Sequence, residues 1–297
     1  MRAALVVCPA SGLGAAARVA GSVSAALRES LDSLDQYVPQ SAAETDAVLK
    51  KLVDAGTEAV VVLGGDGAAH AAVQACAETE TVLAIVPAGT GNDLARALGL
   101  PKDPVEAARV VATGLAGDRR KRIDLGKVEG GGWFATVLCA GFDSAVNERV
   151  NRMSWPWGPR RYDIAIVAEL AALKQARLIV RTESETLELA ANSVAIGNTP
   201  YYGGGIPVCP KADPADGTLD VTVVGKASRR DLVRILPSLR TGAHIDHPAV
   251  STLRAKSVSV AADGGWIGYA DGERVGPLPL EIRCAPGAIN VIAAQAS

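Results

Sequence analysis

The sequence predicts a three-layer α/β domain followed by a β-sandwich domain. Up to Gly117, short apolar runs alternate with stretches of helical pattern, which indicates βαβ units around a parallel sheet. After Gly117, short β-branched runs separated by turn residues are typical of antiparallel strands in a sandwich. We therefore assign residues 1–122 to the α/β domain and residues 123–297 to the sandwich.

The apolar pattern of the first domain predicts its elements. Strands are expected at four runs: Ala3–Val7, the weaker Asp35–Val38, Ala59–Leu63 and Val82–Val86. Helices are expected over three stretches: Ala15–Leu31, Glu44–Asp54 and Val105–Ala112. Ligands of parallel sheets bind beyond the carboxyl ends of the strands, so the turns that follow these strands are the candidate site.

The second domain is expected to be mostly β-structure. Short strands are predicted at Ile123–Val128, Trp133–Leu138, Leu178–Arg181, Leu187–Ala190, Ser193–Ile196, Leu219–Val224, Val258–Ala261 and Leu280–Arg283. Two helical stretches, Arg161–Ala176 and Ser228–Leu239, interrupt them.

Composition restricts the partners. With 48% hydrophobic and 21% charged residues, the chain has the composition of a globular protein rather than a disordered one. The formal net charge of −2 argues against nucleic acid as a partner, and attraction to an anionic membrane would need a local patch. The five scattered cysteines fit a reducing cytosol. No apolar run approaches the roughly 20 residues of a membrane span, so membrane contact is expected to be peripheral.

Two glycine-rich turns follow predicted strands and carry the first functional signal. They are Gly64-Gly65-Asp66-Gly67 and Pro87–Asp93, which contains Gly89, Gly91 and Asn92. Glycine at the end of a strand lets backbone N–H groups wrap a phosphate. An Asp inside such a turn suits a divalent cation that accompanies the phosphates. The repeated pattern predicts a site for a nucleoside triphosphate.

Further motifs share one order with these turns along nearly the whole chain. They are Pro9–Gly14, Gly141-Phe142-Asp143, Tyr202–Gly205, Asp216–Asp220 and Asp271-Gly272-Glu273. In this order the motifs resemble the diacylglycerol kinase catalytic-domain family, which includes bacterial lipid kinases and sphingosine kinases. The resemblance implies a nucleotide-binding α/β domain, a β-sandwich and an active site in the cleft between them. It also implies that the last strand, near Ile289–Ala293, returns to the first domain.

The resemblance assigns roles to individual residues. Glu273 would be the catalytic base that takes the proton of the acceptor hydroxyl, and Asp66 would hold Mg²⁺ on the phosphates. The ATP-binding residues would be Ser11, Gly12, Ser41, Gly64, Gly65, Asp66, Gly67, Ala68, His70 and Thr90. ATP and Mg²⁺ are thus the expected substrate and cofactor.

Several positions depart from the family pattern. The family has Thr at the position of Ala68 and Asn at that of His70, so a hydroxyl is lost and an imidazole replaces an amide. Cys8 and Leu13 stand where Asn and often Lys occur. Gly12-Leu13-Gly14 also fits a dinucleotide fingerprint, as in an NAD-binding oxidoreductase, but only the kinase interpretation accounts for the later turns.

Two loops could hold metals. Asp213, Asp216 and Thr218 resemble the structural Mg²⁺ loop of the family, with a plain Asp-Gly turn as the alternative. His244 and His247 flank Asp246 and could chelate a transition metal, although the sequence supplies no further ligands.

Other residues keep two interpretations. Asn92 could cap the next helix or contact the nucleotide, and Asp93 suits the first turn of that helix. Arg96 could bind phosphate or pair with Asp93. Trp155-Pro156-Trp157, which lies among arginines, could contact lipid headgroups or pack within a loop.

The expected function is ATP-dependent phosphorylation of a hydroxyl on a diacylglycerol-like or sphingoid-like lipid. One alternative is a phosphotransferase like NAD kinase, which also has a Gly-Gly-Asp-Gly turn. The other is a catalytically weak protein that binds nucleotide or lipid, because Leu13, Ala68 and His70 depart from the family. The expected partners are ATP and a lipid at the membrane surface of a cytoplasmic, peripherally associated protein, and a homodimer stays open.

Overall fold

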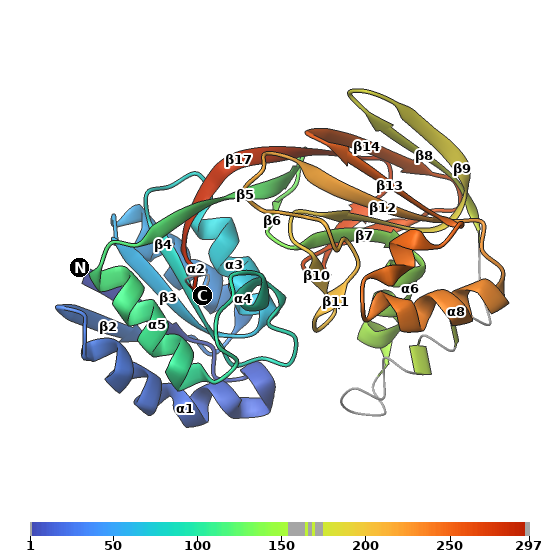
Figure 1. The fold of residues 1–297 in the computed structure, drawn as a ribbon. Coiled ribbons are helices and arrows are strands. Elements are labelled where there is room, and N and C mark those ends of the chain that lie inside the picture. Colours follow the sequence, from blue (N-terminus) through green and yellow to red (C-terminus); the bar gives the residue numbers. More distant parts are fainter. Residues whose placement is uncertain (1, 154–163, 166–167, 170–174, 295–297) are drawn as a thin grey trace.

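The computed structural model describes residues 2–153, 164–165, 168–169 and 175–294 (Figure 1). An α/β domain and a β-sandwich lie side by side, as the sequence predicts. The elements of the first domain are β1 (Arg2–Val7), α1 (Ser11–Arg28), β2 (Ser33–Tyr37), α2 (Ala42–Asp54), β3 (Ala59–Gly64), α3 (Asp66–Cys76), β4 (Val82–Pro87), α4 (Asp93–Ala97) and α5 (Pro104–Ala116).

The first domain has three layers around a parallel sheet. The strands lie in the order β4-β3-β1-β2, and every residue of β3 and β4 is buried, as continuous apolar runs predict for a parallel sheet covered on both faces. Helix α1 packs beside α5 and α2 beside α3, and the two pairs cover opposite faces (Figure 1). The carboxyl ends of β1, β3 and β4 therefore point to one edge.

The second domain consists of antiparallel strands with helices at one end (Figure 1). Its strands are β6 (Trp133–Phe134), β7 (Val137–Gly141), β8 (Ala176–Thr182), β9 (Thr186–Gly197), β10 (Tyr201–Tyr202), β11 (Ile206–Pro207), β12 (Leu219–Gly225), β13 (Val250–Ala255), β14 (Ser257–Ala262), β15 (Ile267–Ala270) and β16 (Glu273–Pro277). Its helices are α6 (Phe142–Arg152), α8 (Arg229–Leu239) and the 3₁₀ turn η1 (Ala243–Asp246).

One pair of long strands joins the domains. β5 (Arg120–Val128) pairs antiparallel with β17 (Leu280–Ile292) along most of its length. β17 begins beside β14 and ends beside β4, with Asn290 opposite Val82, where the resemblance places the last strand. Ile123 belongs to the core of the first domain and Val128 to that of the second. The division at residue 122 therefore falls within a strand that both domains share.

Some predicted elements differ from those observed, each for a local reason. The single strand expected at Trp133–Leu138 is divided into β6 and β7, because the N–H groups of Ala135 and Thr136 donate to the Asp271 carboxylate at 3.0 and 2.8 Å. The two strands expected at Leu187–Ala190 and Ser193–Ile196 are one strand, β9. Asn192, between the two predicted strands, is buried but accepts a hydrogen bond from Ala227 N–H at 2.9 Å. Because its side-chain oxygen has a partner, this polar residue can lie inside a continuous strand.

The helices of the second domain follow the sequence in part. α8 matches the stretch expected at Ser228–Leu239, and Ser228 caps it by accepting from Asp231 N–H. Of the helix expected at Arg161–Ala176, the described residues 164–165 and 168–169 are helical, and Ala176 itself begins β8. α6 was not predicted, because Gly141-Phe142-Asp143 was interpreted as a motif only.

Candidate active site

The two glycine-rich turns pack backbone against backbone at the carboxyl ends of β3 and β4. A Cβ atom added to Gly65 would lie 3.0 Å from the Cα of Gly89. The carbonyl of Gly64 accepts a hydrogen bond from Ala88 N–H at 2.7 Å. This close approach requires glycine at both positions, because a side chain would force the turns apart.

The carboxylate of Asp66 joins the two turns. Its oxygens accept hydrogen bonds from the N–H groups of Asn92 and Asp93 at 2.8 and 2.7 Å, so Asp66 satisfies the first N–H groups of α4. The side chain of Asn92 instead closes its own turn by bonding both backbone groups of Gly89 at 2.9 Å. The expectation that Asn92 caps the helix through its side chain is therefore wrong.

Asp93 is the acidic group of this region with an unused oxygen. Its Oδ2 accepts from Gly204 N–H at 3.0 Å, and Oδ1 is buried without a hydrogen-bond partner among the described residues. Burial raises the pKa of Asp93 above its usual range, and the negative charge of Asp66 adds to this, although the Gly204 and Gly205 N–H groups and the positive charge of Arg96 oppose it. A cation between Asp66 and Asp93 would satisfy the unpaired oxygen, so the two carboxylates fit a divalent ion. The sequence did not indicate the unpaired oxygen, because Asp93 also suits a first helical turn.

Arg96 lies against the second domain rather than in an ion pair with Asp93. Its guanidinium is 5.9 Å from the ring centre of Tyr201, and a Cβ on Gly205 would collide with it. The structure therefore shows a contact between α4 and the β10–β11 hairpin. Of the two interpretations left open for Arg96, pairing with Asp93 is not observed.

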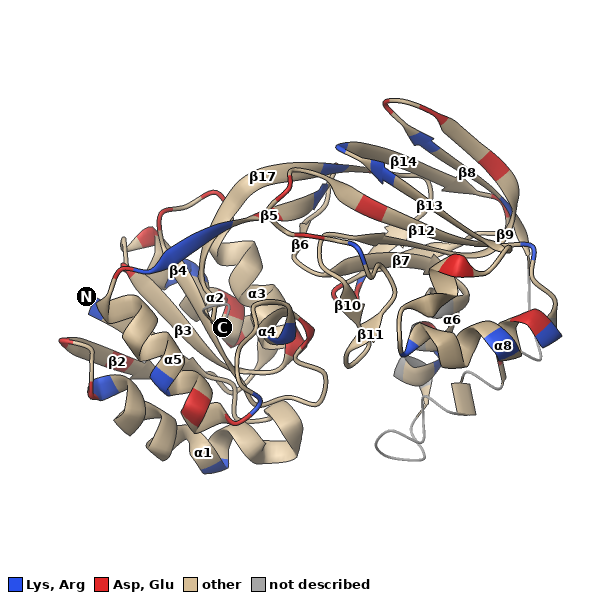
Figure 2. Cartoon of the chain, viewed as in Figure 1, with Lys and Arg blue, Asp and Glu red and all other residues tan. Residues whose placement is uncertain are grey.

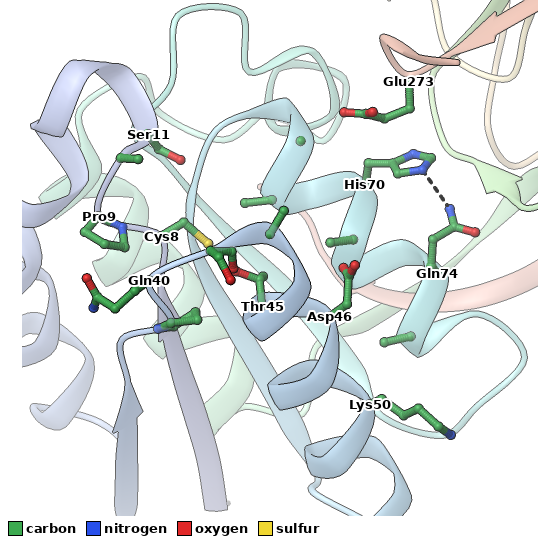
Figure 3. A pocket seen from close by; sticks show the side chains of 18 of the residues that line it. Cys8, Pro9, Ser11, Gln40, Thr45, Asp46, Lys50, His70, Gln74 and Glu273 are labelled. Carbon is green, nitrogen blue, oxygen red and sulfur yellow. Dashed lines mark hydrogen bonds between the residues drawn. The ribbon is translucent and has the colours of Figure 1, made fainter. Parts of the chain in front are cut away.

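A cavity of about 710 Å³ opens beside these turns (Figure 3). Ser11, Ser41, Gly67, Ala68 and His70 of the predicted ATP-binding set line it, together with Glu273. Cys8, noted above as a departure from the family pattern, also lines it. The sequence interpretation missed several further lining residues, because none belongs to a motif: Gln40, Thr45, Asp46, Lys50 and Gln74. The site is therefore formed by three segments of the first domain and one residue of the second.

The remaining predicted nucleotide contacts lie outside this lining. Gly64, Gly65 and Asp66 form the packed turn behind Gly67, and Thr90 is exposed on the second turn. Gly12 has φ +59° and packs against the carbonyl of Ala88, so the backbone geometry explains why glycine occupies this position. Leu13 also has a positive φ of 55° and is 89% exposed, which separates the Pro9–Gly14 loop from the regular part of α1.

Two predicted contacts also have local structural roles. The hydroxyl of Ser11 accepts from Gly65 N–H at 3.3 Å and so connects the first loop to the turn after β3. Ser41 is the N-cap of α2 and accepts from Glu44 N–H at 3.2 Å. Both residues also line the cavity.

A hydrogen-bonded network connects α3 to the turn that precedes Glu273. His70 Nδ1 lies 3.1 Å from Asp271 Oδ2, and Gln74 Nε2 lies 3.3 Å from His70 Nε2 (Figure 3). The backbone of Trp133 fixes the Gln74 amide, since its N–H donates to Oε1 at 2.9 Å and its carbonyl accepts from Nε2 at 2.7 Å. The amide nitrogen must therefore face His70, which suits a neutral ring that donates from Nδ1 to Asp271.

The charge of His70 depends on opposing effects. Burial lowers its pKa, but the hydrogen bond and charge of Asp271, with the carboxylates of Glu273 and Asp46, raise it, and the net direction is upward. Protonation would break the hydrogen bond from Gln74, because both ring nitrogens then donate. His70 thus replaces the family amide with a group whose bonding depends on pH.

Glu273 begins β16, directly after a turn in which Asp271 and Gly272 both have positive φ. The Asp271 carboxylate holds this turn, since it also accepts from Ala135 N–H and from the N–H and hydroxyl of Thr136. A Cβ on Gly67 would lie 3.8 Å from Glu273 Oε1. The Glu273 carboxylate of the second domain therefore faces the Gly64–Gly67 turn of the first domain.

The predicted structural Mg²⁺ loop is organised by protein contacts. Asp216 Oδ1 accepts from the N–H and hydroxyl of Thr218, and Oδ2 pairs with Arg254 at 2.7 Å. Asp213 accepts from Ala215 N–H at 3.0 Å. Both oxygens of Asp216 therefore have partners, and Arg254 supplies the positive charge. An ion in this loop would have to compete with Arg254 for Asp216 and would take its other ligands from the backbone carbonyls of residues 213 and 218.

The two histidines that could chelate a transition metal are engaged in other contacts. His244 is buried and its Nε2 lies 3.0 Å from the carbonyl of Val208, whereas His247 Nδ1 accepts from Ala249 N–H at 3.1 Å. The described parts of the chain contain no group of three or more His, Cys, Asp and Glu arranged to hold a metal ion. Trp155-Pro156-Trp157 lies outside the described residues.

Comparisons with known proteins identify the family. The diacylglycerol kinase catalytic domain model matches residues 2–128, and the YegS C-terminal NAD kinase beta sandwich-like domain model matches residues 136–293. A protein of Mycobacterium tuberculosis (strain H37Rv) named diacylglycerol kinase is 42% identical over 290 residues, which cover 96% of this chain and 92% of that protein. A protein of Stenotrophomonas maltophilia named as a YegS-like lipid kinase is 27% identical and covers 84% of this chain and 82% of its own length.

A solved structure supports the fold. The crystal structure of a diacylglycerol kinase from Bacillus anthracis superposes with a TM-score of 0.77 at 20% identity, over 99% of this chain and 97% of that chain. The chain therefore belongs to the diacylglycerol kinase family of lipid kinases, and the resemblance drawn from its motifs is confirmed. In the part of the chain that the structure describes, no helix is both long and apolar enough to cross a membrane.

We expect N-ethylmaleimide to modify Cys8 first in the native protein, because the other four cysteines are buried. Burial raises the pKa of the Cys8 thiol, and the Thr45 hydroxyl offsets this only in part. The rate should therefore increase about tenfold per pH unit below that pKa. Mass spectrometry of timed samples measures the site and rate, with Cys8→Ser as control. Faster modification of any other cysteine would contradict the cavity described here.

We expect His70→Ala to lower the free energy of unfolding by about 1–2 kcal/mol, because a part-buried hydrogen bond to a carboxylate is lost. Since the folded protein raises the pKa of His70, this loss should be largest below the pKa of an unfolded His and should shrink as pH rises through the folded pKa. Urea unfolding at several pH values measures it. Asp35→Asn, at an exposed position of β2 away from the cavity, serves as the control and should change little. An effect of His70→Ala that does not depend on pH would rule out the proposed ionisation.

Proposed function

We propose that this protein transfers the γ-phosphate of ATP to a hydroxyl of a diacylglycerol-like lipid. The observation that carries the proposal is the position of Glu273, a carboxylate of the second domain that faces the Gly67 turn across the cavity. Phosphoryl transfer needs positioning, charge neutralisation and a carboxylate near the acceptor hydroxyl. The site provides candidates for each role.

The nucleotide would occupy the cavity beside the glycine-rich turns, with its phosphates at Gly67 and Ala68, the first residues of α3. N–H groups at the start of a helix are unpaired and favour an anion. Lys50 is the one Lys or Arg side chain among the lining residues, and it pairs with Asp54 at 3.0 Å, so little phosphate charge is neutralised by cationic side chains there. Most of the phosphate charge would therefore have to be neutralised by a cation bound to the Asp66 and Asp93 carboxylates.

Asp66 and Asp93 would hold that cation, because Asp93 Oδ1 is buried and unpaired. Mg²⁺ bound there would neutralise charge on the phosphate oxygens. The Asp66 carboxylate already fixes the two turns relative to one another, so the site is organised through backbone bonds. Glu273 would accept the proton of the acceptor hydroxyl as the new phosphate ester bond forms.

The acceptor class is supported by the relatives. The Mycobacterium tuberculosis protein, which is 42% identical, is named diacylglycerol kinase, and this supports a diacylglycerol-like acceptor ahead of a sphingoid-like one. The second domain matches a family model whose description refers to NAD kinase, which keeps NAD as the competing acceptor. We propose Mg²⁺-ATP as the donor in either case.

The proposal is tested by incubating the protein with γ-³²P-labelled ATP and Mg²⁺ together with diacylglycerol, sphingosine or NAD. We expect label in phosphatidic acid, recovered by lipid extraction and thin-layer chromatography. Label in NADP would favour the phosphotransferase alternative. Nucleotide binding without transfer to any acceptor would favour the catalytically weak alternative, which the changes at Ala68 and His70 motivate.

Two substitutions should separate the base from the metal ligand. Glu273→Gln keeps the size of the side chain but cannot accept a proton, so kcat should fall on the order of 10²–10⁴-fold with nucleotide affinity nearly unchanged. Asp93→Asn should weaken Mg²⁺-ATP binding as well as turnover, because it changes the carboxylate that has the unpaired oxygen. Kinetics and nucleotide titrations measure both effects. Wild-type turnover by Glu273→Gln would reject the assignment of the base.

A further inference from the structure

The helix α8 has one apolar and one cationic face. Leu232 and Ile235 are buried and pack with Val224 and Ala227 under the helix. The opposite face carries exposed Arg230, Val233, Arg234, Pro237 and Arg240, and we refer to these residues as the α8 outer face. Figure 2 shows the basic positions along this helix. The outer face is thus a continuous strip at helical spacing.

The positive charge of this strip is balanced only in part, by the electrostatic attraction of Asp231 to Arg234. Arg230, Arg234 and Arg240 form no ion pair within the described ranges. Asp231, the acidic residue of the helix, is engaged by the N–H and hydroxyl of Ser228 at 2.9 and 2.7 Å. From Lys226 to Arg240 the sequence has five Lys or Arg residues and one Asp, although the whole chain carries a net charge of −2. The α8 segment therefore carries a local excess of positive charge.

The strip also exposes apolar surface and contains a proline. Val233 is 59% exposed, which is high for a branched aliphatic side chain, and it lies beside Arg230 and Arg234 on the same face. Pro237 has no N–H, so it cannot donate the helical hydrogen bond to the carbonyl of Val233. A cationic helix face with an exposed aliphatic side chain suits the headgroup layer of an anionic bilayer, where Arg contacts phosphate and Val enters the acyl boundary.

We propose that the α8 outer face docks on an anionic phospholipid surface and holds the second domain against the membrane that contains the acceptor. The proposal rests on the proposed function for the identity of the acceptor, but the docking itself needs neither ATP nor catalysis. Charge complementarity selects the partner, because the strip offers three arginines to phosphate groups and one apolar contact. Attraction of this kind weakens as salt screens it.

The test is co-sedimentation of the full chain with sucrose-loaded vesicles, without ATP or acceptor lipid. Vesicles of phosphatidylcholine are compared with vesicles in which a quarter of the lipid is phosphatidylglycerol. We expect binding to the anionic vesicles only, with loss at high salt. The double variant Arg230→Ser, Arg234→Ser should lower the partition coefficient on the order of tenfold. Val233→Ser should lower it less, and its effect should persist at high salt.

The matched control removes two cations from a different surface. Lys102 and Arg109 are exposed at and near α5 in the first domain, so the double variant Lys102→Ser, Arg109→Ser changes the net charge equally. It should bind anionic vesicles as the wild type does, and both double variants should unfold at the wild-type temperature. Equal losses in the two double variants would show that only net charge matters and would overturn the proposal.

Two further outcomes would also overturn it. They are equal binding of wild type to both kinds of vesicle, and unchanged binding of the α8 double variant. If docking is confirmed while no lipid is phosphorylated, the proposed function fails and the docking surface stands. If both hold, the α8 variant should lose activity on diacylglycerol in anionic vesicles but keep it on a water-dispersed short-chain diacylglycerol, since Glu273 and the nucleotide cavity are unchanged.

Discussion

The pairing of β5 with β17 determines how the two domains are placed. This antiparallel ladder begins in the sandwich and ends beside β4 of the parallel sheet, so backbone hydrogen bonds continue from one domain to the other. A covalent linker alone would leave the domains free to move. Here the shared strands hold the sandwich near the carboxyl ends of β3 and β4. The active site depends on this constraint because its groups come from both domains.

Carboxylates that accept backbone hydrogen bonds organise the region between the domains. Asp66 joins the two glycine-rich turns, and Asp271 holds the junction of β6 and β7 together with His70. Asp124, which is buried, accepts from Gly217 and Gly287 N–H at 2.7 Å each and so connects the loop before β12 to β17. Bonds to an ionised acceptor are stronger than neutral ones, which suits positions that must hold reacting groups in place. Asp93 differs from these because one of its oxygens stays unpaired.

The departures from the family pattern have local consequences that the structure makes visible. At position 70 the imidazole connects to Asp271 and Gln74, so an interaction between the domains is present although its chemistry has changed. At position 68 the methyl group lines the cavity and offers no hydrogen bond. The Leu13 side chain points into solvent from a loop with positive φ, where it contributes no charge to a phosphate. A nucleotide in this cavity would therefore depend more on N–H groups and on a cation than on side-chain contacts.

The sequence by itself determined the class of the fold and most of its strands, because alternating apolar runs and turn residues report local burial and local backbone geometry. It also located the glycine-rich turns, since glycine is a local signal, whereas Glu273 was singled out only by the resemblance to the family. Tertiary structure alone decided the division of the strand at Ala135, the pairing of Asp216 with Arg254 and the unpaired oxygen of Asp93. Each of these depends on groups far apart in the sequence. The contacts of Ala135 and Asp216 are fixed by packing within the second domain, and the surroundings of Asp93 only when β5 and β17 bring the two domains together.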